Sequence, residues 1–249
     1  KLLGAPLTLL VDAGLLICSA VVLKGIRIHE QMQDKTNRQF WPQLVEGLRF
    51  VRQERRLVQL AWMMGGWQFF AHMALSVQVL FAIRALELDE KTLALSYVAL
   101  GLGSIVGGLS GPRLAKRIGV GNALLSGLVV AGVGWLLLAF GPGAMGAAMR
   151  FGLMLLLYAL GGTLMFIHFL SIRQALTPTL LLGRMTSTMR WLTMLPAGPG
   201  ALLGGWLGEH LGLSVSLFCA GSGACLIALI GWGSSSLPAI KHLPSGTHP

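Results

Sequence analysis

The sequence contains few charged residues. Only 11% of its 249 residues are Asp, Glu, Lys or Arg, whereas soluble domains carry about 25%. More than half of the chain, 54%, is hydrophobic, so there is too little polar side-chain surface to cover a fold of this size with water. The composition therefore excludes a soluble enzyme of one or two domains and favours an integral membrane protein.

Cysteine is also scarce, and its positions exclude several kinds of site. Cys18, Cys219 and Cys225 all lie inside apolar runs, without the spacing of a metal site or a disulfide framework. We therefore expect no metal and no cofactor. An intramembrane lysine for a retinal Schiff base is missing too, because no Lys lies near the centre of an apolar run.

Long apolar runs fill most of the chain. A helix that spans a bilayer needs about 20 mostly apolar residues. Seven segments meet this length: 5–24, 59–83, 93–111, 122–140, 151–172, 188–208 and 213–233. The sequence thus predicts an all-α integral membrane protein with seven transmembrane helices.

Basic residues fall mainly on one side of the expected membrane. Fifteen Lys and Arg residues belong to Lys24 and the alternate connections 25–57, 112–121, 173–190 and 234–249. The other side holds four: Lys1, Arg84, Lys91 and Arg150. Because basic loops stay in the cytosol, the C-terminus is predicted to be cytosolic and the N-terminus to lie outside. The net charge of +10 is thereby assigned to topology, and no nucleic acid partner is expected.

The longest polar stretch, 25–57, has a helical pattern of its own. Trp41, Leu44, Leu48 and Val51 recur on one face of a helix, while arginines lie largely elsewhere. The pattern predicts an amphipathic helix in the inner membrane interface. The alternative is a solvated charged linker.

An internal repeat relates the first and last apolar segments. Leu3-Gly4 and the following LTLL resemble Leu211-Gly212 and the following VSLF, 208 residues further on. Five predicted helices intervene, so each segment would be the last helix of a six-helix unit, an arrangement found in transporters. An external N-terminus that begins at Lys1 without a signal peptide is typical of a fragment, and we expect upstream helices.

Four motifs resemble one transporter family. They are LTLLVDA at 7–13, EGLRFVR at 46–52, GPRLAKRIG at 111–119, and LTP at 176–178 with GRM at 183–185 and Ser187. Their order and positions resemble the major facilitator superfamily, in the group of exporters close to the enterobactin exporter. The resemblance covers essentially the whole chain, aligned to helices six through twelve of twelve.

The resemblance implies both an organisation and a function. It implies that 1–29 is the last helix of a missing N-terminal half, 30–57 a cytosolic linker, 58–237 a six-helix bundle and 238–249 a cytosolic tail. It also implies export of a siderophore, drug or similar amphipathic molecule from the bacterial cytoplasm by proton antiport, and no enzyme activity. The expected partners are the substrate, protons, the lipid bilayer and the missing half. Lys116 stands where the stronger first-half version of the loop motif carries Asp, so gating by an acid is not assigned here.

Polar groups inside the apolar segments are candidates for the substrate and proton pathway. An ionisable side chain in a bilayer costs about 3 kcal/mol, which makes Asp12 a candidate proton carrier. Gln68 and His72 lie one helical turn apart, and Gln78 lies further along the same segment. The alternatives are a packing role for Asp12 and a helix–helix hydrogen bond for Gln68 and His72.

Two further groups could act in gating. Pro196, Gly198, Pro199 and Gly204 resemble the family's Gly-Pro helix bend, which would shape closure of the pathway or simply pack. Four basic residues lie in predicted cytosolic loops, where they would lock an inner gate or only fix topology: Arg113, Lys116, Arg117 and Arg184.

A rival from another class is an intramembrane serine protease. Gly108-Leu109-Ser110-Gly111 matches Gly-x-Ser-Gly, and His168 lies on another predicted span. Such an enzyme requires Ser110 within hydrogen-bond reach of a histidine. A third possibility is a membrane fragment that does not transport.

Overall fold

The computed structural model describes residues 5–24, 40–140, 145–178 and 181–240. Helices make up 89% of these described residues, and none of the residues in these ranges forms a strand. The predicted all-α class is therefore confirmed. The chain divides into two compact units, 1–39 and 40–249.

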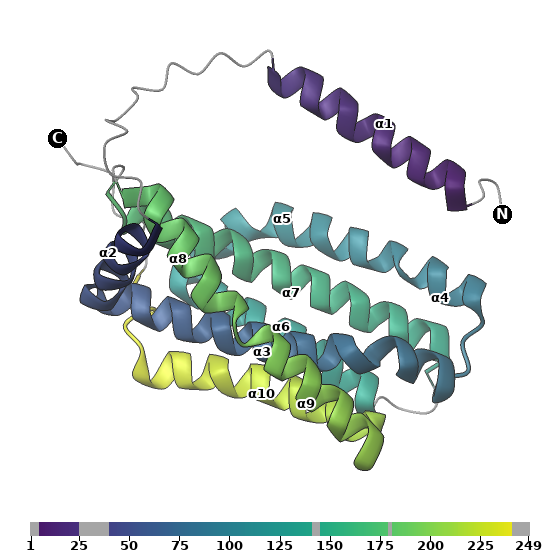
Figure 1. The fold of residues 1–249 in the computed structure, drawn as a ribbon. Helices are drawn as coiled ribbons and strands as arrows, with labels where there is room; N and C mark the ends of the chain where they lie inside the picture. Colours follow the sequence, from purple (N-terminus) through teal and green to yellow (C-terminus); the bar gives the residue numbers. More distant parts are fainter. Residues whose placement is uncertain (1–4, 25–39, 141–144, 179–180, 241–249) are drawn as a thin grey trace. The chain divides into compact units, whose positions relative to one another are not determined.

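The first unit contains one described helix, α1 (Ala5–Lys24), which coincides with the first predicted span. The larger unit is a bundle of long helices that alternate in direction, with α2 across the end where α3 and α8 begin (Figure 1). Its helices are α2 (Phe40–Gln53), α3 (Arg55–Arg84), α4 (Glu90–Ser96), α5 (Val98–Ile118), α6 (Val120–Phe140), α7 (Ala147–Ala175), α8 (Leu182–Met194), α9 (Ala197–His210) and α10 (Leu213–Ser234).

Among the described residues, five helical stretches are long and apolar enough to cross a membrane. They are Arg55–Arg84, Glu90–Ile118, Val120–Phe140, Ala147–Ala175 and Leu213–Ser234. The molecule is accordingly a multi-pass membrane protein. The predicted span 188–208 is not one continuous helix, because α8 ends at Met194 and α9 begins at Ala197.

Glycines with positive φ lie at two of the turns between helices. Gly119 has φ 90° between α5 and α6, and Gly212 has φ 100° between α9 and α10. This backbone region is open to glycine and strained for other residues. Both glycines allow the chain to reverse direction within one or two residues.

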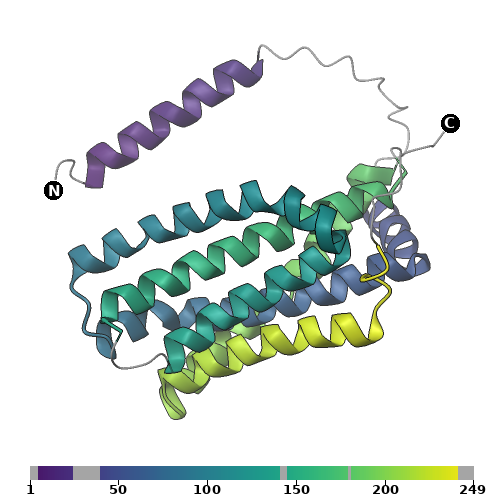
Figure 2. The same ribbon diagram turned by 180° about the vertical axis from the view of Figure 1, so that it is seen from behind.

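Glycine contacts join α6 to its neighbours α7 and α10, which flank it in Figure 2. A Cβ on Gly127 would lie 2.6 Å from the carbonyl oxygen of Gly161, and a Cβ on Gly161 would in turn overlap the carbonyl of Gly127. Gly132 and Gly221 form the same reciprocal pair between α6 and α10, at 2.8 and 2.7 Å. Close backbone approach of this kind is how small residues hold membrane helices together.

Glycines spaced every fourth residue allow α5 to pack closely on α7. Gly103, Gly107 and Gly111 are the buried residues of α5. A Cβ on Gly103 would overlap the Leu156 carbonyl, and one on Gly107 would lie 2.8 Å from the carbonyl oxygen of Leu160. The every-fourth-residue spacing is therefore a packing stripe.

Arg150 ties three helices together at the end of the bundle far from α2. Its guanidinium donates to the carbonyl of Leu138, at 3.1 Å from Nε and 2.5 Å from Nη2, near the end of α6. Its Cζ also lies 5.8 Å from the ring centroid of Phe81 on α3. A cation is favourable at a helix C-terminus, where carbonyl groups lack helical partners.

Helix α2 packs on α8, with a buried face that differs in part from the predicted one. Val51 is buried as expected, but Leu48 is 45% exposed, and Gly47 takes the buried position. The reason is steric, since a Cβ on Gly47 would overlap the Thr188 hydroxyl of α8 and lie 3.1 Å from the Arg184 carbonyl oxygen. The side chains of residues 40–44, including Trp41 and Leu44, lie outside the described part of the chain.

Asp89 caps the N-terminus of α4, and its ionisation is coupled to that helix. Its carboxylate accepts from the backbone N–H groups of Lys91 (3.2 Å) and Thr92 (3.3 Å). Hydrogen bonds from Thr92, first from its side chain and then from its backbone, lower the pKa of Asp89 below its ordinary value of 3.8. The anionic cap therefore stabilises α4 above the unfolded-state pKa.

We expect this cap to be lost as the pH falls through the lowered pKa of Asp89, that is, below 3.8. The measurement is hydrogen exchange of the α4 amides at pH 7 and in acid. Asp89→Ala should increase exchange already at pH 7, whereas Asp89→Asn, which still accepts, should keep protection at both pH values. Equal protection of the unaltered protein at pH 7 and pH 2 would contradict the coupling.

Candidate functional site

An open hollow of about 280 Å³ lies between α3, α5, α7 and α8. These helices face the viewer in Figure 1, while α6 lies behind them. We call it the Gln68 hollow. It is lined by Met64, Trp67, Gln68, Leu100, Ser104, Tyr158, Ala159, Gly162, Thr163, Met165, Phe166 and Met194.

Polar groups enter the Gln68 hollow from three helices. Gln68 on α3 is buried and donates from Nε2 to the sulfur of Met194 on α8, at 3.2 Å. Ser104 on α5 donates to its own helix, to the Leu100 carbonyl at 3.1 Å. Thr163 of α7 also lines the hollow, so hydroxyl and amide groups stand among apolar walls. This mixture suits an amphipathic ligand.

Three aromatic rings support one wall of the hollow. Trp67 lies 5.3 Å from Trp135 and 6.0 Å from Tyr158, measured between ring centroids, and both pairs are stacked. Trp135 on α6 is fully buried, and its Nε1 has no hydrogen-bond partner among the described residues. The stack fixes Trp67 and Tyr158 at the lining, which keeps the wall rigid.

The helix is interrupted between α8 and α9, beside this hollow. Pro196 is the N-cap of α9, with φ −71° and ψ −12°, and neither it nor Pro199 can donate a backbone hydrogen bond. Two donors of the helical hydrogen-bond series are therefore missing over this turn, although Leu195 N–H still donates to the Trp191 carbonyl and Gly200 N–H to the Pro196 carbonyl, each at 3.0 Å. After the break, a Cβ on Gly200 would overlap the Phe69 carbonyl of α3, and one on Gly204 that of Met73.

The glycines of the predicted bend thus differ in what they do. Gly204 is buried against α3, and its carbonyl accepts from the Ser216 hydroxyl of α10 at 2.9 Å. Gly198 has no neighbour within 4 Å of an added Cβ. The bend places α9 tightly on α3 while α8 borders the Gln68 hollow. Its part in gating stays a prediction.

The three predicted pathway residues on α3 do not all reach the hollow. Gln68 lines the hollow, whereas His72 bonds through Nδ1 to the Gln68 carbonyl at 2.8 Å within α3. Gln78 is buried, and its Oε1 has no hydrogen-bond partner among the described residues. Asp12 belongs to α1, but its side chain lies outside the described part of the chain.

The predicted gate residues stand near the α2 end of the bundle. Arg184 forms an ion pair with Glu46 of α2, at 2.5 Å between Nη1 and Oε2. Arg113 donates weakly to the carbonyl of Leu109 on its own helix, at 3.4 Å. Lys116 and Arg117 are exposed in the last turn of α5. Within the described part of the chain, Arg184 is the one of these four residues that bonds to another helix.

The pair required by the protease alternative is not joined in the described structure. The Ser110 hydroxyl donates to the Gly107 carbonyl of its own helix, at 3.3 Å. His168 is buried, and its Nε2 has no hydrogen-bond partner among the described residues. The two residues come from neighbouring helices, but no hydrogen bond connects them.

Several lining residues were not predicted from the sequence. Ser104, Tyr158 and Thr163 are polar residues within apolar segments, which is the signal that could have identified them. Ionisable and amide groups stand out in an apolar run because their burial is costly, whereas a hydroxyl group can donate to its own helix, as Ser104 does. Trp67 carried no such signal, because a tryptophan in an apolar run usually packs.

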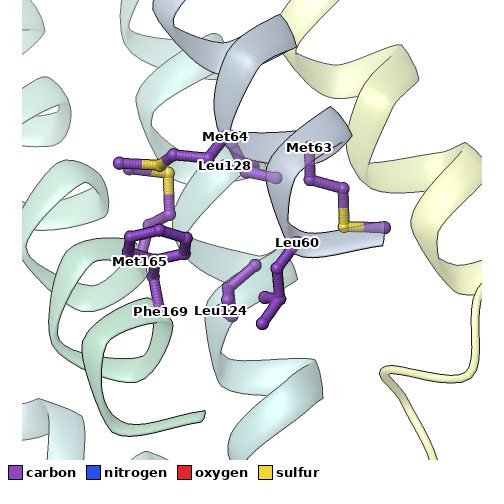
Figure 3. Close-up of a pocket in the computed structure, with 7 residues that line it drawn as sticks. All are labelled: Leu60, Met63, Met64, Leu124, Leu128, Met165 and Phe169. Carbon is purple, nitrogen blue, oxygen red and sulfur yellow. The ribbon is translucent and has the colours of Figure 1, made fainter. Parts of the chain in front are cut away.

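A smaller cavity beside the hollow is a packing gap. It has a volume of about 10 Å³ and an apolar lining of leucine, methionine and phenylalanine side chains (Figure 3). Met64 and Met165 point toward each other across it, while Met63 lies on the side of α10. A cavity of this size holds at most one water molecule, and this lining offers no polar partner.

Comparison with protein-family models and with curated proteins finds no match for this chain.

Proposed function

We propose that this chain is the C-terminal part of a secondary active transporter of the major facilitator type, in the bacterial cytoplasmic membrane. It exports a small amphipathic molecule of the siderophore or drug class. Export is driven by proton antiport and proceeds by alternating access. The observation that carries the proposal is the Gln68 hollow, since it combines polar groups with an aromatic wall within a multi-pass bundle.

The open side of this hollow supports a pathway shared with another part of the protein. Helix α5, on one flank, exposes apolar side chains such as Leu102 and Ile105, and α8 exposes Trp191 on the other flank. Of the 18 most apolar consecutive residues in Glu90–Ile118, only 11% are buried. A second half placed over these flanks encloses the hollow and completes a substrate site.

The distribution of charge supports an orientation with the α2 end in the cytosol. Arg55 is the first residue of α3 there, Arg117 lies in the last turn of α5, and Arg184 lies in the first turn of α8. Arg84 and Arg150 lie at the opposite end, and the guanidinium of Arg150 donates hydrogen bonds to the Leu138 carbonyl of α6. Loops rich in arginine and lysine remain on the cytosolic side.

The function is tested with everted membrane vesicles from cells that produce the native gene product, in which export appears as accumulation of the substrate inside the vesicles. Everted membrane vesicles are energised to build a proton gradient, and accumulation of ethidium or enterobactin is followed. We expect accumulation that collapses when nigericin dissipates the gradient. Accumulation that persists without the gradient contradicts antiport, and the absence of accumulation of either probe contradicts the proposed substrate class.

The 249-residue chain by itself is the matched control. Reconstituted alone into liposomes, it is expected to give no proton-driven transport, because it supplies one wall of the pathway. Proton-driven transport by the chain alone would overturn the division of the pathway between two halves. The alternative, a membrane fragment that does not transport, predicts that the native gene product also fails with both probes.

A further inference from the structure

A second, separate hollow lies on the other face of α3. It is a groove of about 320 Å³ between α3 and α10, which pack side by side along their length (Figures 1 and 2). We call it the Trp62 groove. It is lined by Gln59, Trp62, Met63, Gly66, Ile227, Ile230, Ser234 and Ser235.

The Trp62 groove changes in polarity from one end to the other. Trp62, Ile227 and Ile230 form an apolar body, and Trp62 is 79% exposed. Toward the α2 end of the bundle the lining becomes polar, with Gln59 on α3 and Ser234 on α10. An amphiphile with one polar end fits this order.

A cation stands at the polar end of the groove. Arg55, Gln59, Trp62 and Gly66 are spaced i, i+4, i+7 and i+11, so they share one face of α3. Arg55 is exposed and is the first residue of the helix. From Arg55 to Gly66 the helix rises about 16 Å, close to the depth of one leaflet of a bilayer.

The amide of Gln59 is held in one orientation. Its Oε1 accepts from the backbone N–H of Ser236 at 3.1 Å and from the Ser236 hydroxyl at 2.8 Å. Because the oxygen is occupied, the Nε2 group is left to donate. A positive charge and an amide donor at one end of an apolar groove are complementary to a phosphate group that carries acyl chains.

We propose that the Trp62 groove binds an anionic phospholipid. The phosphate lies against Arg55 and the Nε2 of Gln59, and one acyl chain lies along Trp62 and Ile230. This site is on the face of α3 opposite to the Gln68 hollow, and it does not depend on the proposed export. It anchors α10 to α3 through a lipid at the edge of the bundle.

The test compares two phospholipids with identical acyl chains, one with a phosphatidylglycerol headgroup and one with phosphatidylcholine. Native mass spectrometry of the purified protein counts the lipid molecules retained by each variant. We expect preferential retention of phosphatidylglycerol, and about a fivefold weaker retention in Arg55→Gln. Arg56→Gln is the matched control, because Arg56 is also exposed but does not lie on the face of α3 that Arg55 shares with Gln59 and Trp62.

A second measurement places the acyl chain. Phosphatidylglycerol with brominated acyl chains quenches tryptophan fluorescence, and Trp62→Phe should remove more of this quenching than Trp191→Phe. Trp191 is also exposed, but it lies on α8, away from the groove. Equal retention of the two lipids, or equal effects of Arg55→Gln and Arg56→Gln, would overturn the proposal. Equal quenching losses in the two tryptophan variants would overturn the placement of the chain in this groove.

Discussion

Gly161→Ala is expected to destabilise the protein by about 2 kcal/mol and to lower its midpoint of thermal unfolding by about 5 °C. The added Cβ would overlap the Gly127 carbonyl and lie 2.6 Å from the backbone nitrogen of Ala131, both on α6. These are backbone atoms of a packed helix, so neither can rotate away as a side chain would. The helices α6 and α7 must therefore separate.

The neighbouring residue provides a matched control. Gly162 has nothing within 4 Å of an added Cβ, so Gly162→Ala makes the same chemical change without a clash. Alanine favours a helix over glycine by up to about 1 kcal/mol, so this variant should be as stable as the unaltered protein or more stable. Both are measured by thermal unfolding in one detergent, followed by tryptophan fluorescence. Equal midpoints for the two variants would contradict the close contact of α6 and α7.

Gln68→Leu is expected to reduce efflux by the native gene product three- to tenfold. Leucine keeps most of the volume of the side chain but removes an amide from the Gln68 hollow, and a lost hydrogen bond costs about 1 kcal/mol. The reduction should appear as a raised KM for the exported probe. Initial rates over a range of probe concentrations measure it.

The alternative role of Gln68, a bond between helices, needs its own control. Met194→Leu removes the same hydrogen bond between α3 and α8 but leaves the amide in the hollow. Near-normal efflux in Met194→Leu with impaired efflux in Gln68→Leu assigns the amide to the substrate. Equal losses in both variants would assign it to packing. Gln174→Leu, an exposed glutamine at the end of α7, should have no effect.

The helical architecture was predictable because the bilayer imposes a simple rule. A spanning helix must be apolar over about 20 residues, and hydropathy alone finds such runs. The stripe of Gly103, Gly107 and Gly111 was also visible, since its spacing repeats with the helix. The sequence predicts a bend at Pro196 and Pro199, but it does not show that α8 ends at Met194 and α9 begins at Ala197. Missing backbone donors alone do not determine whether a helix bends or is interrupted.

The candidate site was much less predictable than the fold. Gln68 was identified because an amide in an apolar run is conspicuous, but its neighbours Ser104 and Thr163 come from other helices. Which residues meet in a hollow depends on helix rotation and on close approach. Those are set by contacts such as Gly107 against Leu160, which no single segment reveals. The exposed position of Leu48 has the same origin, since Gly47 gives α8 a closer fit.

The break at Pro196 separates two sets of connections. After Pro196, α9 packs closely on the backbone of α3 through Gly200 and Gly204. Before Pro196, α8 is connected to α2 by the ion pair of Arg184 with Glu46 and by the close contact of Gly47 with Thr188. A displacement of α2 is therefore expected to move α8 as well, with the turn at Pro196 as the hinge. A shift of α2 is therefore expected to move α8 at the rim of the Gln68 hollow, while α9 stays packed on α3 through its glycines.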